Sequence, residues 1–217
     1  MNKILVVLLF ISSTCLFASD KIKDGVYQIR VYEKLSNGNT SLKCGTAFAI
    51  SNEYLISAGH VFNGEERVKA YSDTDYKDEL EGICVDIDLI ADLSLIKITK
   101  GKPKNVLTLA KNDVETSESV YFIGSTSSEY PRKSKVGKNL GLWYTGKIDR
   151  NFMINLKVKP GNSGSPVLLE SDTVVGVVIA RNSTYDDDFG ICVMVKFVKA
   201  LLVKNKVKFT ESKGEQK

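Results

Sequence analysis

Short stretches in which apolar and polar residues alternate dominate the first half of the chain. A period of two places every second side chain on the same face, which is typical of a half-buried β-strand. Such stretches occur at residues 26–32, 45–50, 54–57, 67–71, 82–87 and 93–98. Six short strands of this kind can close a small antiparallel barrel, so we expect a first barrel over residues 22–105.

The second half repeats this pattern and then changes period. Strand-like stretches occur at residues 119–123, 137–146, 153–158, 166–169, 174–180 and 190–195, which predicts a second barrel over residues 115–196. Residues 195–207 place apolar side chains at helical spacing with lysines between them, which predicts an amphipathic helix. The predicted fold class is therefore all-β, with two six-stranded antiparallel β-barrels and a C-terminal α-helix.

The first 18 residues have a different character. Lys3 precedes the apolar run Ile4–Ile11, and small residues including Ala18 follow it. This order is typical of a secretory signal peptide, and the run is short for a membrane-spanning helix, which is the alternative. We expect residues 1–18 to be removed, residues 19–217 to form one domain, and the mature protein to be secreted or periplasmic without membrane attachment.

Composition narrows the range of partners. Hydrophobic residues make up 43% of the chain and charged residues 26%, which favours a folded domain over disorder. The net charge is only +4, and no basic-aromatic cluster suggests a nucleic-acid partner. Without the leader, Cys44, Cys84 and Cys192 remain, an odd number whose pairing the sequence does not determine. We expect a monomer with no cofactor and no metal.

A serine between glycines is the most distinctive local feature. Ser163 lies in the run Gly161–Pro166, directly after Pro160. Because Gly161 tolerates a positive φ, this turn can expose Ser163 Oγ while the N–H groups of Gly161 and Ser163 point to one place, as in an oxyanion hole. The alternative is an ordinary surface turn that joins two strands.

A serine needs a neighbouring base to act as a nucleophile. His60 is the only histidine of the chain and follows a predicted strand. A carboxylate must then orient the imidazole, and Asp92 is the preferred candidate because it directly precedes the strand at 93–98. Asp86 and Asp88 compete for this role. The alternative for all of them is a structural histidine with solvated loop carboxylates.

These three stretches, in this order, resemble the chymotrypsin-fold serine endopeptidases. The matching residues are 45–60, 91–98 and 160–166. The similarity is greatest to the bacterial high-temperature-requirement proteases and glutamyl endopeptidases, and it covers nearly all of the chain after the leader. It implies a trypsin-like protease that hydrolyses protein or peptide substrates through His60, Asp92 and Ser163 and an acyl-enzyme intermediate. The amides of Gly161 and Ser163 would form the oxyanion hole.

Two other functions compete with this interpretation. The run around Ser163 also fits the G-x-S-x-G elbow of α/β-hydrolases, but those enzymes place their histidine after the serine, and none follows Ser163 here. The second competitor is a catalytically silent binding module of the chymotrypsin fold. The presence of all three catalytic residue types argues against it.

Substrate specificity is less well determined. Alignment on the serine motif places the primary pocket near Lys157 and Val158, with walls from Ile179, Ala180, Arg181 and Gly190. Lys157 or Arg181 inside the pocket would favour an acidic residue before the cut, although such side chains usually point to solvent. Val178 stands where glutamyl endopeptidases have a second histidine, which speaks against glutamate specificity.

Two departures from the animal enzymes carry further predictions. Asn162 stands where those enzymes have an aspartate that pairs with a newly cut N-terminal amine. We therefore predict activity that does not depend on such a cut. Cys44 matches the first half of a disulfide that flanks the histidine in the animal enzymes, but Val61 occupies the second position. The resemblance therefore predicts that this bridge is missing.

Overall fold

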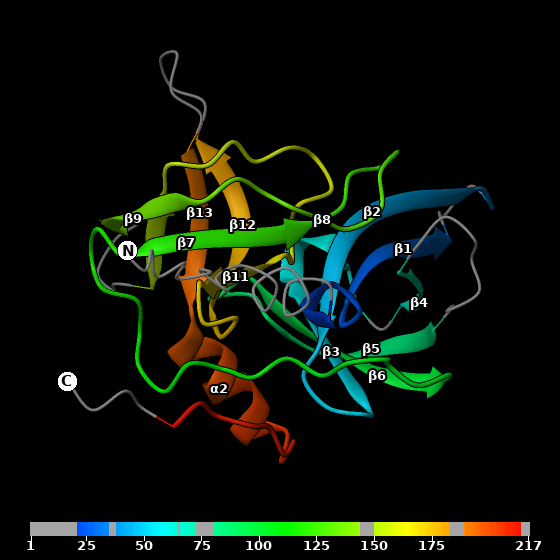
Figure 1. The fold of residues 1–217 in the computed structure, drawn as a ribbon. Helices are drawn as coiled ribbons and strands as arrows, with labels where there is room; N and C mark the ends of the chain where they lie inside the picture. Colours follow the sequence, from blue (N-terminus) through cyan, green and yellow to red (C-terminus); the bar gives the residue numbers. More distant parts are fainter. Residues whose placement is uncertain are drawn as a thin grey trace, which may run out of the picture.

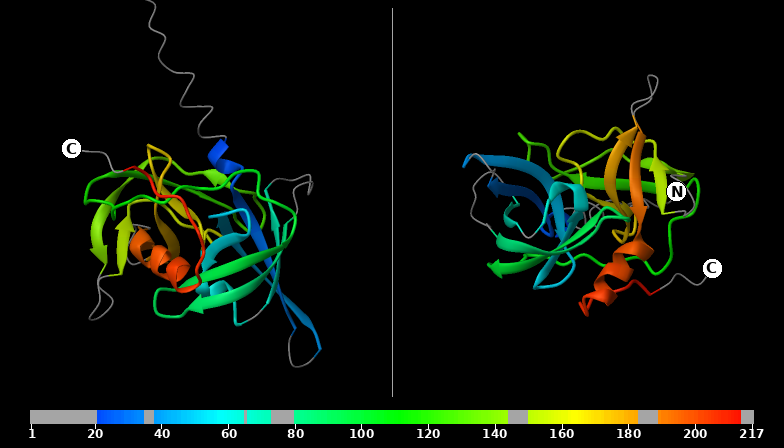
Figure 2. Two further views of the ribbon diagram at one scale, coloured as in Figure 1. Left: turned by 90° about the horizontal axis from the view of Figure 1, so that it is seen from below. Right: turned by 180° about the vertical axis from the view of Figure 1, so that it is seen from behind.

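Two barrels lie side by side, with one helix against both (Figures 1 and 2). The computed structural model describes residues 21–34, 38–64, 66–72, 80–143, 150–182 and 189–213. The expected leader, residues 1–18, lies outside this part of the chain. No helix among the described residues is long and apolar enough to cross a membrane.

The first barrel is closed and antiparallel. Its strands are β1 (Val26–Lys34), β2 (Thr40–Ala49), β3 (Tyr54–Ala58), β4 (Arg67–Tyr71), β5 (Leu80–Asp88) and β6 (Leu93–Lys100), paired in the order β1-β2-β3-β6-β5-β4. The ring closes where β1 pairs with β4. This arrangement confirms the six-stranded barrel predicted for the first half.

The second barrel is formed by the strands that follow. They are β7 (Ser119–Gly124), β8 (Arg132–Lys133), β9 (Gly137–Trp143), β10 (Asn151–Ile154), β11 (Pro166–Leu169), β12 (Val174–Asn182) and β13 (Phe189–Met194). Six of them run in the order β11-β12-β13-β10-β9-β7, and the pairing of β11 with β7 closes the ring. The short β8 pairs with the end of β7. The fold prediction is therefore confirmed for both halves.

Several strands are apolar on both faces because each face meets a different core. On β7, Val120 and Phe122 belong to the core inside the second barrel, whereas Tyr121 and Ile123 belong to the core shared with the first barrel. A strand that is buried on both faces has no solvent-facing side, so apolar residues occupy the positions that would otherwise be polar. The shared core extends the first barrel's interior to the second barrel and fixes how the two meet.

The C-terminal helix closes this shared core. Helix α2 (Val195–Lys204) follows β13 directly and contacts β12, β13 and β6 (Figure 2). Its buried side chains are Val195, Val198, Leu201 and Leu202, which share one face by their helical spacing.

The C-terminal helix and β10 both end earlier than the sequence pattern suggests. The helix expected over 195–207 stops at Lys204, and Lys206 has a positive φ of 57°. The strand expected over 153–158 is β10, which begins at Asn151 and ends at Ile154. The chain then leaves the sheet and leads toward the turn that carries Ser163.

Candidate active site

The three candidate catalytic residues come from loop and turn positions of both barrels. His60 lies in the 3-10 turn η1 (Gly59–Val61) that follows β3, and Asp92 lies in the connection between β5 and β6. Ser163 lies in the segment between β10 and β11 of the second barrel. The junction of the two barrels therefore brings together side chains that are far apart in the sequence.

Asp92 and His60 make two contacts with each other. The main-chain N–H of His60 donates to Asp92 Oδ1 at 2.7 Å, and His60 Nδ1 lies 2.7 Å from Asp92 Oδ2. A carboxylate can only accept, so Nδ1 carries the ring proton and Nε2 is left as an acceptor.

The free imidazole nitrogen faces the serine. His60 Nε2 lies 3.0 Å from Ser163 Oγ, so the hydroxyl donates to the ring. His60 is half-exposed and Asp92 is partly buried. This chain of hydrogen bonds, from carboxylate to imidazole to hydroxyl, is the arrangement that lets a histidine take the serine proton.

Local backbone geometry allows Asp92 to approach His60. Asp92 has a φ of 55°, in the left-handed region that aspartate tolerates better than most residues. Gly59 N–H donates to Asp92 O at 2.9 Å. A Cβ at Gly59 would lie 3.0 Å from Asp92 Oδ1 and 3.1 Å from its main-chain carbon, so glycine leaves room for this contact.

The other two carboxylates that compete with Asp92 have different partners. Asp88 Oδ1 accepts the main-chain N–H groups of Ile90 and Ala91, both at 2.9 Å, and so shapes the turn that leads to Asp92. Asp86 binds Lys204 and Asn205 at the end of α2. The structure therefore brings Asp92, and neither competitor, to His60.

The segment before the serine forms a tight turn. Asn162 N–H donates to Lys159 O at 3.0 Å, with Pro160 and Gly161 in the central positions. Gly161 has a φ of 96°, which together with Pro160 fits a type II turn. Neither the N–H of Gly161 nor that of Ser163 donates to a partner among the described residues. Both amides expected to form the oxyanion hole are thus available to a ligand.

The Asn162 side chain ties this turn to the loop after β7. Its Oδ1 accepts the N–H of Lys159 at 2.8 Å, and its Nδ2 donates to Ser125 O at 2.7 Å. The two backbone partners fix the orientation of the amide, because one can only donate and the other can only accept. Both polar atoms of the uncharged side chain are therefore hydrogen-bonded inside the protein.

The disulfide predicted to be missing is not formed, because Cys44 is a free thiol and position 61 is a valine. A Cβ built on Gly45 would lie 3.1 Å from Val61 Cγ2, so Gly45, rather than Cys44, faces Val61. Cys44, Cys84 and Cys192 are thiols and not disulfide partners. Burial raises the pKa of the Cys192 thiol well above its usual value, which keeps that thiol protonated.

The predicted pocket residues divide into a buried and an exposed set. Val158, Ile179 and Gly190 are buried, whereas Lys157, Ala180 and Arg181 are exposed. A Cβ at Gly190 would lie 2.8 Å from both Val158 Cγ2 and Ile154 Cγ1. Ile154, which also lies against Gly190, has no signal in the sequence beyond its place in an alternating strand.

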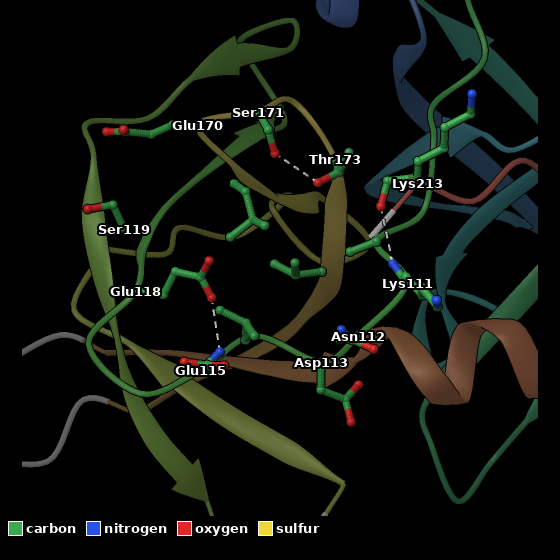
Figure 3. Close-up of a pocket in the computed structure, with 15 residues that line it drawn as sticks. Lys111, Asn112, Asp113, Glu115, Glu118, Ser119, Glu170, Ser171, Thr173 and Lys213 are labelled. Carbon is green, nitrogen blue, oxygen red and sulfur yellow. Dashed lines mark hydrogen bonds between the residues drawn. The ribbon is translucent and has the colours of Figure 1, made fainter. Parts of the chain in front are cut away.

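A separate cavity of about 410 Å³ lies at the second barrel (Figure 3). It is lined by the segment Ala110–Glu115, the start of β7, the turn between β11 and β12, and the C-terminal residues Ser212 and Lys213. None of the triad or pocket candidates lines it. Within the described ranges, no three His, Cys, Asp or Glu residues are grouped so that they could hold a metal ion.

Comparison with known proteins places this geometry in a family. The trypsin-like peptidase domain matches residues 45–177. Human serine protease HTRA4 is 26% identical over 171 residues, which is 73% of this chain and 35% of that protein's length. This chain therefore spans about a third of that relative.

Solved structures share the fold. The active form of the Rv3671c protease from M. tuberculosis has a TM-score of 0.73 at 19% identity, with 99% of this chain and 97% of that chain covered. An inactive form of the same protease has a TM-score of 0.70 at 20% identity, with 88% and 96% covered. The match over residues 45–177, on two barrels of this topology, shows that the chain belongs to the trypsin-like peptidase family.

Proposed function

We propose that this chain is a serine endopeptidase in which His60, Asp92 and Ser163 form the catalytic triad. The observation that carries the proposal is the continuous hydrogen-bonded chain from Asp92 Oδ2 through both imidazole nitrogens to Ser163 Oγ. Family membership supports the reaction class, and the contacts support the role proposed for each residue.

In the proposed reaction, Ser163 Oγ attacks the peptide carbonyl while His60 Nε2 takes its proton. Asp92 stabilises the imidazolium that forms and keeps the ring in place. The tetrahedral intermediate collapses when His60 returns the proton to the leaving amine, which leaves an acyl group on Ser163. Water, activated by the same histidine, then hydrolyses the ester.

The amides of Gly161 and Ser163 would stabilise the oxyanion in both steps. The positive φ of Gly161 and the lack of another acceptor for either N–H among the described residues support this role. Removal of one such donor typically costs about 3–4 kcal/mol of transition-state stabilisation. Because Asn162 is bonded within the turn, we propose that this hole forms without an N-terminal cut.

For the substrate, we propose a preference for a small aliphatic residue before the scissile bond. Ile154 and Val158 lie against Gly190 at the base of the expected pocket, and all three residues are buried. Lys157 and Arg181 are exposed, so neither charge is buried at this apolar base.

Secretion is a separate proposal. It rests on the charged start and apolar run of residues 3–11 alone. N-terminal sequencing of protein from the culture medium or periplasm is expected to begin near Ser19. Recovery only of a chain that still begins at Met1 would contradict it.

The decisive experiment combines covalent labelling with cleavage. Wild type should react with a fluorophosphonate and hydrolyse a peptide library, whereas Ser163→Ala should do neither and still fold. Ser171→Ala, at an exposed serine outside the site, should label like wild type. Labelling that survives in Ser163→Ala would contradict the assignment, and failure of folded wild type to label or cleave would favour a binding module.

The same library tests the pocket. Cleavage after alanine or valine is expected to exceed cleavage after arginine or glutamate. A preference for glutamate would place Lys157 or Arg181 in the pocket and overturn the aliphatic proposal, while the triad assignment would remain.

A further inference from the structure

One residue of the first barrel is bonded to both residues of the expected oxyanion hole. Thr46, on β2, donates its main-chain N–H to Ser163 O at 2.8 Å. Its side-chain Oγ1 donates to Gly161 O at 2.8 Å. Thr46 is completely buried, so its own polar atoms are shielded from solvent.

A second buried hydroxyl holds the Thr46 side chain in this orientation. Ser125 N–H donates to Thr46 Oγ1 at 3.0 Å, and Ser125 Oγ lies 2.8 Å from the same atom. Ser125 Oγ also reaches Gly45 O at 3.1 Å. Thr46 Oγ1 thus accepts from the Ser125 N–H while its own proton points to Gly161 O.

The network continues to the residue between the two hole amides. Ser125 O accepts from Asn162 Nδ2 at 2.7 Å, and Ser57 Oγ donates to Thr46 O at 2.7 Å. Ser57 and Ser125 are fully buried and Asn162 is nearly so. Every polar atom of Thr46 therefore has a partner, which is what a buried network needs to be rigid.

An oxyanion hole works only if its donors are held in place before the charge develops. Thr46 fixes the carbonyls of Gly161 and Ser163 to one point on the first barrel, and so sets the spacing of their amides. On the basis of the proposed function, we propose that Thr46, oriented by Ser125, is a positioning residue that preorganises the oxyanion hole. It does not touch the substrate.

The alternative is that Thr46 contributes only to stability, and a substitution series separates the two roles. Thr46→Val keeps the branched shape and removes the hydroxyl. We expect its kcat to fall about 10- to 100-fold with little change in KM, because a misplaced donor weakens transition-state binding. Thr46→Ser retains the hydroxyl and should recover most of kcat.

Tyr27→Phe is the matched stability control. Tyr27 is also a buried residue of the first barrel, and its hydroxyl donates to Asp24 O and accepts from Lys104 N–H. Its loss should lower the thermal midpoint and leave kcat unchanged. A Thr46→Val variant whose kcat matches that of Tyr27→Phe, or whose KM alone rises, would overturn the positioning role.

A second readout reports on the hole itself. A peptide boronate forms a tetrahedral adduct with the serine, so its inhibition constant should weaken in Thr46→Val by about the factor lost in kcat/KM. Unchanged boronate affinity would overturn the proposal. If Thr46→Val does not fold, Ser125→Ala is measured instead. We expect a smaller loss of kcat in Ser125→Ala, and a wild-type kcat in that variant would overturn the proposal.

The failure of this inference differs from the failure of the proposed function. Wild type that labels and cleaves, beside an equally active Thr46→Val, removes only the positioning role. A folded wild type that neither labels nor cleaves removes the proposed function, and the positioning role with it.

Discussion

Asp92 binds His60 through both of its carboxylate oxygens. Oδ1 accepts the main-chain N–H and Oδ2 faces Nδ1, each at 2.7 Å. The first contact fixes the backbone of the turn and the second fixes the ring on that backbone. One carboxylate therefore sets both the position of the imidazole and its tautomer, which leaves Nε2 to accept from Ser163.

Asp92→Asn should lower kcat by about 10⁴-fold, the typical loss for this change in a serine-protease triad. An amide offers only one acceptor to two donors of His60, so it favours the wrong tautomer or leaves the main-chain N–H unpaired. Steady-state kinetics on the best library peptide measure the effect. Asp113→Asn is the control, since Asp113 has a side chain 30% exposed against 29% for Asp92 and pairs with Lys196. Equal kinetics in the two variants would contradict the role of Asp92.

Asn162→Asp should reduce both stability and activity. The amide nitrogen that donates to Ser125 O would become an oxygen, which places a buried carboxylate against a carbonyl. We expect the free energy of unfolding to fall by about 3 kcal/mol, measured by urea titration, with a parallel loss of fluorophosphonate labelling.

Asn155→Asp is the control for this substitution. Asn155 is exposed, and its Oδ1 accepts the N–H of Lys138, a bond that aspartate can keep. It should behave like wild type. A fully active and stable Asn162→Asp would show that the amide bridge is not needed to hold the turn.

Ser165→Ala should stabilise the protein. Ser165, which follows the Ser163 turn in the chain, is fully buried, and its Oγ has no hydrogen-bond partner among the described residues. Because the desolvated hydroxyl is uncompensated, we expect a gain of about 1 kcal/mol in the free energy of unfolding. Ser57→Ala, which removes a buried hydroxyl that does have a partner, should change stability in the opposite direction. A loss in both variants would contradict this account.

Asp86 should contribute a pH-dependent part of the stability. Burial raises the pKa of this carboxyl, but hydrogen bonds from Lys204 and Asn205 outweigh it and hold the pKa below its usual value of 3.8. The stabilisation is therefore present at neutral pH and is lost as the pH falls below 3.8 toward the folded value.

Thermal midpoints of wild type and Asp86→Asn measured from pH 7 downward test this contribution. The difference between them should shrink as the pH falls below 3.8. Glu81→Gln removes a more exposed carboxylate that pairs with Lys100, and solvent screening should leave its effect small. A gap between wild type and Asp86→Asn that stays constant through this range would show that the ion pair is not its cause.

The sequence by itself determined the fold class and the candidates for the site. Period-two alternation identified most of the strands, because successive side chains of a strand point to opposite faces of the sheet. A single histidine left His60 as the only possible base for Ser163. The alternation is a property of each short segment, and the number of histidines is a property of the whole composition. Both can be determined without knowing which segments contact each other in the fold.

Tertiary structure decided which groups meet. The sequence offers Asp86, Asp88 and Asp92, and it favours Asp92 only for its place directly before a strand. In the fold, Asp86 binds Lys204 at the end of α2, whereas Asp92 contacts His60. The bond from Thr46 to Gly161 O depends in the same way on how one barrel packs against the other. This packing determines which residues far apart in the chain become hydrogen-bond partners. The local periodicity of the sequence carries no information about these long-range contacts.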